Sequence, residues 1–164
     1  MIFVSVGTNE ARFDRLLRAV AELPLDEELL IQHGHSSPVP APTAKLVDFL
    51  SFEEMVEAMR NSRVVVTHAG VGSVMVALAN GRRPVVVPRQ KSFGEAVDDH
   101  QLQLGRRFAG AGLVTLVEST HALGAALAGA QEAATIVPSA SALAADLTTF
   151  LDASIRRRSS AAHA

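Results

Sequence analysis

Two short glycine-rich segments carry residues that could bind a phosphate, and the stronger of them is Thr67–Ser73. Within it, Gly70 and Gly72 stand two positions apart, directly after the apolar run Arg63–Thr67. Glycine lets the backbone approach a ligand closely, and Ser73 can cap a helix or donate a hydrogen bond. A diphosphate at a helix N-terminus gains about 0.3–1 kcal/mol, and up to ~2 kcal/mol where the site is partly buried. The pattern favours a phosphate-binding loop over glycines that merely pack a helix against a strand.

The second segment is Gly7-Thr8-Asn9, which follows the apolar, β-branched run Ile2–Val6. Glycine permits a tight turn here, and a following helix would offer free N–H groups and the positive end of its dipole to an anion. A short polar turn after a strand also occurs without any ligand. A phosphate role and plain turn geometry therefore stay equally open for Gly7 and Thr8.

A third polar group consists of Arg89 and the run Asp98–Gln101, which follow another short apolar segment. Asp99, His100 and Gln101 combine a carboxylate, an imidazole and an amide, the mixture of donors and acceptors that discriminates sugar hydroxyls. One of the two aspartates could instead be a simple helix N-cap. Ligand pairs such as His-x-x-x-His, or Asp-x-Asp at a strand end, are missing from the sequence, so no metal site is predicted.

Two common nucleotide-binding motifs do not fit this sequence. The spacing Gly70-x-Gly72 lacks the third glycine of G-x-G-x-x-G and follows the fourth predicted strand, whereas that fingerprint follows the first. The second predicted strand ends in Gln32-His33, without the acidic residue that would bind a ribose 2′-hydroxyl. A Walker loop is also excluded, because no Gly-Lys-Ser/Thr occurs.

The elements that must position these residues alternate between strands and helices. Apolar runs predict strands, and apolar residues at helical spacing between stop signals predict helices. The alternation predicts an α/β fold with a parallel six-stranded sheet and helices on both faces, in a single domain over residues 1–155 followed by a disordered tail over 156–164. Ligands of such sheets gather at the carboxyl ends of the strands, where all three polar groups fall. The predicted strands are Ile2–Val6, Glu28–Gln32, Lys45–Leu50, Arg63–Thr67, Pro84–Val87 and Leu113–Leu116, and the predicted helices are Asn9–Leu23, Ser51–Arg60 with Glu54 at the capping-box position, Ser73–Asn80, Asp99–Ala109, 119–132 and 139–156.

Composition narrows the function classes. The 164 residues contain no cysteine, which excludes disulfides, zinc knuckles, thiol catalysis and iron–sulfur clusters. The net charge of −2 gives no electrostatic footprint for nucleic acid. The apolar run at the N-terminus is too short for a signal peptide or a membrane span, so we expect a soluble, intracellular domain whose fold begins at Met1.

Three segments together resemble the donor-binding half of family 28 glycosyltransferases: Phe3–Leu17, Val65–Gln90 and Asp98–Phe108. The likeness runs in order from Ile2 to about Leu116. It is strongest to the short stand-alone subunits of the Alg13 type, from lipid-linked oligosaccharide synthesis, and of the PssE type, from bacterial exopolysaccharide synthesis. The loop after Pro88-Arg89 is more similar to the PssE type.

The resemblance implies the C-terminal, Rossmann-like half of a GT-B transferase. That half holds a UDP-sugar, and a separate membrane-associated chain of the Alg14 or PssD type binds the lipid-linked acceptor. It implies an inverting hexosyltransferase that needs no metal or other cofactor, is inactive without its partner, and lies in the cytoplasm, peripheral to the membrane. A non-catalytic nucleotide-binding scaffold or regulatory subunit is the alternative.

The resemblance also assigns site residues. The general base would lie in the partner, and Glu95 is the one internal candidate. The backbone at Phe49 or Leu50 would read the uracil edge. The remaining donor-binding residues would be Gly7 and Thr8 in the first loop, His68, Ala69, Gly70, Gly72 and Ser73 in the diphosphate loop, and Arg89 with Asp99, His100 and Gln101 around the sugar and ribose.

Overall fold

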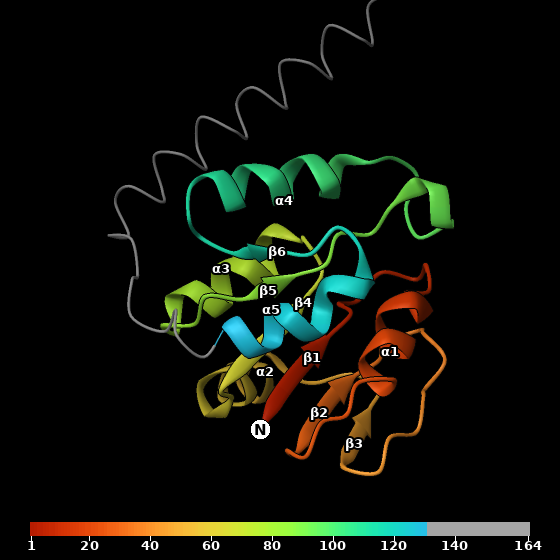
Figure 1. Ribbon diagram of the computed structural model, residues 1–164, viewed down its shortest axis with the longest axis vertical. Helices are drawn as coiled ribbons and strands as arrows, with labels where there is room; N and C mark the ends of the chain where they lie inside the picture. The colour runs from red at the N-terminus through yellow and green to blue at the C-terminus, as the bar shows by residue number, and fades with distance from the viewer. Residues whose placement is uncertain (131–164) are drawn as a thin grey trace, which may run out of the picture.

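The computed structural model describes residues 1–130, which form one parallel six-stranded sheet with helices on both faces (Figure 1). The strand order is β3-β2-β1-β4-β5-β6, and every neighbouring pair is parallel. The α/β fold and all six predicted strands are thereby confirmed. The strands are β1 (Ile2–Ser5), β2 (Leu29–Gln32), β3 (Ala44–Val47), β4 (Val64–Thr67), β5 (Val85–Val86) and β6 (Thr115–Leu116), and the helices are α1 (Asp14–Ala21), α2 (Phe52–Asn61), α3 (Val71–Ala79), α4 (His100–Gly110), α5 (Leu123–Gly129) and the short 3₁₀ turns η1 (Lys91–Phe93) and η2 (Thr120–Ala122).

Alternate residues of the central strands enter different cores, as strand geometry requires. Ile2 and Val4 of β1 belong to the core beneath α1 and α5, whereas Phe3 belongs to the core shared with α2 and α3. A third cluster, which includes Leu104 and Phe108, packs α4 and α3 against β5. Figure 1 shows α5 crossing in front of the sheet. The sheet is therefore covered on both faces, which explains why its strands are continuous apolar runs.

The helix boundaries depart most from the predicted ones at two places, and α3 also begins two residues before the predicted Ser73. The helix predicted from Asn9 begins at Asp14, because Asn9 Oδ1 accepts a hydrogen bond from the Ala11 N–H at 2.8 Å and closes a turn. The helix predicted over 119–132 is divided into η2 and α5. The predicted helix 139–156 and the tail 156–164 lie outside the described residues.

The capping box predicted at the start of α2 is present. The Glu54 N–H donates to Ser51 Oγ, and the Glu54 carboxylate accepts from the Ser51 N–H. This reciprocal pair fixes where the chain turns from β3 into α2. Within residues 1–130, no helix is long and apolar enough to cross a membrane.

Candidate functional site

The strand order reverses between β1 and β4, the place where parallel α/β sheets bind ligands. The two strands are in register, with Ser5 paired to Thr67, so the loops that follow them leave the sheet side by side. A cavity of about 300 Å³ opens there, called the β1–β4 cavity below. It is lined by Phe3, Ser5, Gly7, Thr8, Gln32, Phe49, Leu50, Met55, His68, Gly72 and Ser73.

Six of the predicted site residues meet in the β1–β4 cavity, from three separate loops. Gly7 and Thr8 follow β1, Leu50 precedes α2, and the segment after β4 supplies the rest. Ala69 is buried beneath that segment, in the core with α3 and α4. The fold therefore brings together the two glycine-rich segments that the sequence singled out.

His68 is packed between the two glycine-containing loops. A Cβ atom at Gly7 would stand 2.5 Å from His68 Cε1, and one at Gly70 would stand 2.2 Å from His68 Nε2. Gly7 also has a φ of +78°, which L side chains rarely adopt. The position of the imidazole therefore leaves no room for a side chain at Gly7 or Gly70.

Burial, and to a smaller extent the positive charge of Arg89, lower the pKa of His68 to about 4. The imidazole is consequently neutral at physiological pH. Its Nδ1 lies 3.3 Å from Thr67 Oγ1. A neutral ring can donate one N–H to a ligand, but it adds no positive charge to the β1–β4 cavity.

Helix α3 begins at the rim of the β1–β4 cavity. Gly70 is its N-cap and has no side chain to satisfy the first N–H groups, so the backbone donors of the first turn stay available. Gly72 and Ser73, in that first turn, line the cavity. The arrangement suits an anion bound at the positive end of the helix dipole.

The polar cluster at the start of α4 does not line the β1–β4 cavity. The Asp99 carboxylate accepts from the Lys91 N–H at 2.9 Å, and the Gln101 side-chain oxygen accepts from the Arg89 N–H at 3.2 Å. Asp99 occupies the N-cap position, yet it is Asp98 whose carboxylate accepts from the His100 N–H, at 3.0 Å. These contacts organise the loop between β5 and α4, and the sugar-contacting roles of Asp99, His100 and Gln101 stay predictions.

Arg89 is fully buried, with 0% of its surface exposed. Its Nη2 donates to the Val6 carbonyl at 3.0 Å, and its Nη1 donates to the Ala11 and Arg12 carbonyls at 2.6 and 3.3 Å. The guanidinium therefore ties the loop after β5 to the loop after β1. Its predicted contact with a donor stays a prediction. The hydrogen bonds that the guanidinium makes go to backbone carbonyls and stabilise the two loops.

Glu95, the internal candidate for a general base, is also engaged. It is 4% exposed, and both its carboxylate oxygens lie 2.9 Å from nitrogens of Arg15. The Gln90 N–H donates to the same carboxylate at 3.1 Å. A carboxylate held in this way has little freedom to take a proton from an acceptor.

Gln32 and Ser5 were missed by the sequence reasoning, although both line the β1–β4 cavity. Gln32 is 5% exposed and is hydrogen-bonded to Ser5 at 2.7 Å. A buried glutamine at the end of the apolar run LLIQ was the available signal, because a buried amide must have partners.

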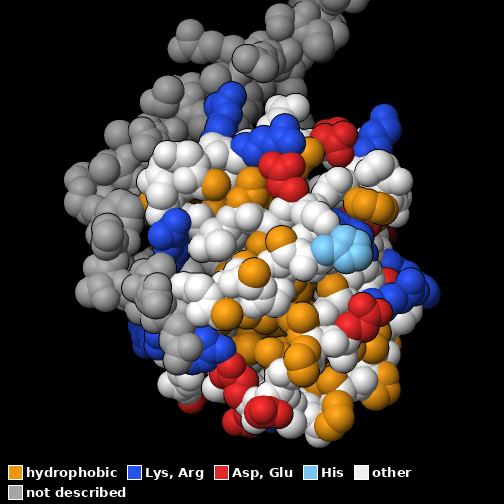
Figure 2. All heavy atoms as spheres, viewed as in Figure 1, with side chains coloured by type: hydrophobic (Ala, Val, Ile, Leu, Met, Phe, Trp, Pro, Cys, Tyr) orange, Lys and Arg blue, Asp and Glu red, His pale blue; other side chains and the backbone are white. Residues whose placement is uncertain are grey.

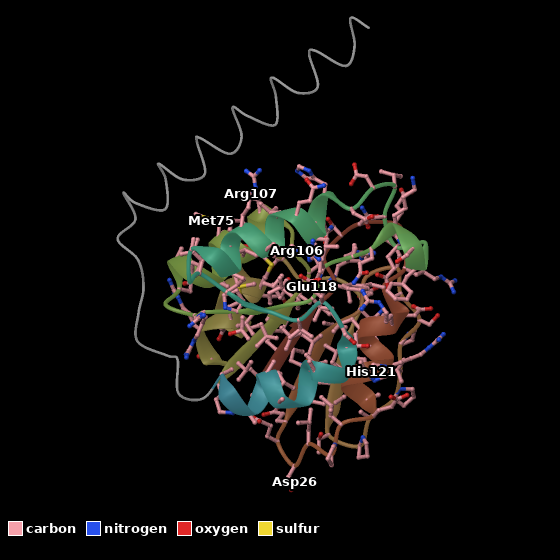
Figure 3. All side chains as sticks on the ribbon, turned by 45° about the horizontal axis from the view of Figure 1, so that its top comes forward. Asp26, Met75, Arg106, Arg107, Glu118 and His121 are labelled. Atoms are coloured by element: carbon pink, nitrogen blue, oxygen red, sulfur yellow. The ribbon has the colours of Figure 1, made fainter. Side chains whose placement is uncertain are left out.

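A larger cavity of about 710 Å³ lies away from the predicted phosphate loops, between α1, η1 and η2. Arg15, Phe93 and His121 are among its lining residues (His121 is labelled in Figure 3).

The face drawn in Figure 2 has apolar side chains gathered over its lower half and charged side chains around them. Near α4, Arg106 and Glu118 point toward each other and form an ion pair of 2.7 Å (Figure 3). Within residues 1–130, no three His, Asp or Glu side chains are placed to hold a metal ion.

The fold of residues 1–130 is similar to that of the C-terminal half of GT-B glycosyltransferases. The chain is structurally similar to MurG from Acinetobacter baumannii, with a TM-score of 0.57 and 20% identity over 89% of this chain and 48% of that one. It is likewise similar to CalG4, the calicheamicin glycosyltransferase, with a TM-score of 0.57 and 16% identity over 82% of this chain and 37% of that one.

Similarity in sequence identifies the family of the chain, which the fold alone does not. Residues 1–152 match the glycosyltransferase family 28 C-terminal domain, and the chain belongs to that family. It is also 29% identical over 118 residues to the human UDP-N-acetylglucosamine transferase subunit ALG13, which covers 65% of this chain and 10% of that protein. The chain therefore spans a tenth of that relative, and less than half of each of these two solved glycosyltransferases.

Proposed function

We propose that this chain is the UDP-sugar-binding subunit of a two-component inverting glycosyltransferase that acts on a lipid-linked acceptor. The carrying observation is the β1–β4 cavity, where two glycine-containing loops enclose a neutral His68 beside the first turn of α3. Its position at the reversal of strand order is where a nucleotide binds in this class of sheet. Family membership and the likeness to a transferase subunit support the same function.

In the proposed reaction, an acceptor hydroxyl attacks the anomeric carbon of the bound sugar. The bond from that carbon to the diphosphate oxygen breaks, and negative charge develops on the leaving UDP. Backbone N–H groups at the start of α3 would receive that charge, and preorganised donors of this kind lower the barrier without moving. The backbone at Phe49 or Leu50, two residues that also line the cavity, would read the uracil edge.

The partner would supply the general base and the acceptor site. Glu95 is held by Arg15 and is therefore a poor base, so the isolated chain is expected to bind the donor and not to transfer it. The partner would be an Alg14-like or PssD-like membrane-associated chain in exopolysaccharide or glycolipid synthesis, and the likeness to the ALG13 subunit supports the first of these. The alternative is a scaffold subunit without a working donor site, and the experiment must distinguish it from the proposed donor-binding subunit.

An amide-resolved NMR titration with UDP tests the proposal, with NADH as the control ligand. We expect UDP to shift the amides of Gly7, Gly70–Ser73 and Leu50, and NADH to leave them in place. Ser73→Ala should weaken UDP binding, whereas Ser92→Ala, on the exposed η1 turn outside the cavity, should not. Absence of UDP shifts both in the free chain and in the chain bound to its partner would favour the scaffold function.

A further inference from the structure

We propose that Gln32 is a positioning residue that couples two ends of the β1–β4 cavity. One end is the loop after β1, which would face the diphosphate, and the other is the segment Asp48–Leu50, which would face the base. The inference rests on the proposed function, because it concerns how that pocket is held for a uridine nucleotide.

The Gln32 amide bridges both ends directly. Its Nε2 donates to the Gly7 carbonyl at 3.1 Å and to the Asp48 carbonyl at 3.0 Å. Its Oε1 accepts from Ser5 Oγ at 2.7 Å. The orientation of the amide follows from this network, since only the nitrogen can donate to two carbonyl oxygens. A single side chain thus fixes two loops that are far apart in sequence.

On the phosphate side, the hydrogen bonds close a ring around Gly7. The Gly7 N–H donates to Ser5 Oγ at 3.3 Å, the Ser5 hydroxyl donates to Gln32, and Gln32 donates back to the Gly7 carbonyl. Gly7 is held at a φ of +78° inside this ring. The ring therefore stabilises the turn that brings the backbone beside His68 and into the β1–β4 cavity.

On the base side, the same amide fixes the peptide that follows β3. The Asp48 carbonyl accepts from Gln32 and also from the Gly34 N–H at 2.9 Å. The Phe49 N–H donates to Asp48 Oδ1 at 2.9 Å, and the His35 and Phe49 rings pack in a T-shaped arrangement with their centroids 5.3 Å apart. Phe49 and Leu50, which line the cavity, are consequently presented in one orientation.

Gln32 and Ser5 also form part of the cavity wall, so their effect on a ligand is short-range. Buried amides whose donors and acceptor are all satisfied specify one arrangement of their neighbours, because each alternative leaves a buried polar group without a partner. Without the amide, the loop after β1 at the diphosphate end and the segment Asp48–Leu50 at the base end should both lose their fixed positions. Affinity for UDP and preference for uracil over other bases should then fall in the same variant.

The test compares Gln32→Met with wild type, and Gln90→Met is the matched control. Gln90 also donates its amide to a backbone carbonyl, that of Glu118 at 2.8 Å, but it lies outside the β1–β4 cavity. Calorimetric titrations with UDP and GDP give the affinity and the base preference. We expect Gln32→Met to weaken UDP binding about tenfold or more and to reduce the UDP/GDP ratio, and Gln90→Met to change neither.

Ser5→Ala provides a second, milder variant in case Gln32→Met does not fold. It opens the ring at Gly7 and leaves the bond from Gln32 to Asp48, so it should weaken UDP binding while retaining more of the base preference than Gln32→Met. Amide shifts of Thr8 and Phe49 in the ligand-free variants report the two ends separately, and both should move in Gln32→Met.

The outcomes separate the inference from the proposed function. A wild-type chain that binds no UDP, alone or with its partner, would overturn the proposed function and this inference with it. Wild-type binding of UDP with an unchanged UDP/GDP ratio in folded Gln32→Met would overturn the coupling alone. Movement of only one of the two amides, Thr8 or Phe49, would overturn it as well.

Discussion

The imidazole of His68 packs so closely on the backbone at Gly70 that a Cβ atom there would stand 2.2 Å from His68 Nε2. Gly70 has φ −74° and ψ 130°, values that any residue can adopt. The need for glycine at this position therefore comes from the contact with His68, and backbone conformation does not require it. The contact joins the end of β4 to the first turn of α3.

Gly70→Ala is expected to destabilise the fold by about 1–3 kcal/mol, the usual cost of inserting a methyl group into a packed site. The imidazole must move away from the new methyl group, and it would then press on Gly7. Urea denaturation gives the free energy of unfolding, and a loss of UDP affinity should accompany it. A stability equal to wild type would contradict the close contact.

Gly72→Ala is the matched control, two residues further along. Among the described residues, a Cβ at position 72 would meet no atom within 4 Å. Because Gly72 lies in the first turn of α3, alanine should leave stability unchanged or raise it by up to about 1 kcal/mol. If the first turn cradles a diphosphate, UDP binding should nevertheless weaken, since the methyl group enters the β1–β4 cavity.

The depressed pKa of His68 makes stability depend on pH. Burial, and then the charge of Arg89, lower its pKa from 6.5 to about 4 in the folded state. Between these values the unfolded chain binds a proton that the folded chain does not, so stability falls as the pH drops from about 6.5 toward 4. Between pH 7.5 and pH 5 the loss should be about 1–2 kcal/mol.

Urea denaturation at the two pH values, for wild type and His68→Gln, isolates this contribution. The variant lacks the titrating ring and should lose less stability between pH 7.5 and pH 5. The lowered carboxyl pKa values of Glu27 and Glu118 act mainly below their ordinary value of 4.5, outside this window. Equal losses in the two proteins would show that His68 titrates normally.

The sequence predicts the order and type of the elements well, because apolar runs and helical spacing are local signals. The start of α1 was wrong by five residues, and the local turn at Asn9 is only part of the reason, because a non-local contact acts as well. The Phe13 N–H donates at 2.8 Å to Ser36 Oγ, in the loop between β2 and β3, and this bond holds the chain outside the helix. A partner 23 positions away leaves no trace in the local pattern.

Among the site residues, too, local sequence signals could be predicted and contacts between distant segments could not. The glycine-rich loops were predictable because their residue types restrict what the backbone can do there. The role of Gln32 depends on the pairing of β1 with β2, which sets Ser5 opposite Gln32. Arg89 is predicted to bind a donor because it is polar and follows a strand, and that role stays a prediction; its hydrogen bonds to the carbonyls of the loop after β1 could not be predicted, because they join segments far apart in sequence.

Arg89→Met is expected to raise the pKa of His68 toward 6.5, because it removes the positive charge that lowers it. The shift should be partial, since burial is the larger cause. NMR titration of the His68 ring protons measures it. Arg89→Lys is the control: it keeps the charge and should leave the His68 pKa near the wild-type value. Both variants should lower stability, because neither methionine nor lysine can match the fork of hydrogen bonds to Val6 and Ala11.

Glu95→Gln distinguishes a structural carboxylate from a catalytic base. The substitution removes the charge that pairs with Arg15 while keeping the shape of the side chain. It leaves a partly buried guanidinium without its counter-charge, so we expect a loss of about 2–4 kcal/mol in the free energy of unfolding. Arg15→Met should cost a similar amount, and the double variant should cost less than the two losses added together.

The rate of sugar transfer, measured with the partner chain present, decides whether Glu95 is the general base. Loss of a general base lowers the rate by about 10²–10⁴-fold. At a temperature where Glu95→Gln is fully folded, we expect the transfer rate to change by less than tenfold, because the carboxylate is occupied by Arg15 and by the Gln90 N–H. A fall of a hundredfold or more, with UDP affinity intact, would instead make Glu95 the base, and the Arg15 pair would then have to open during the reaction.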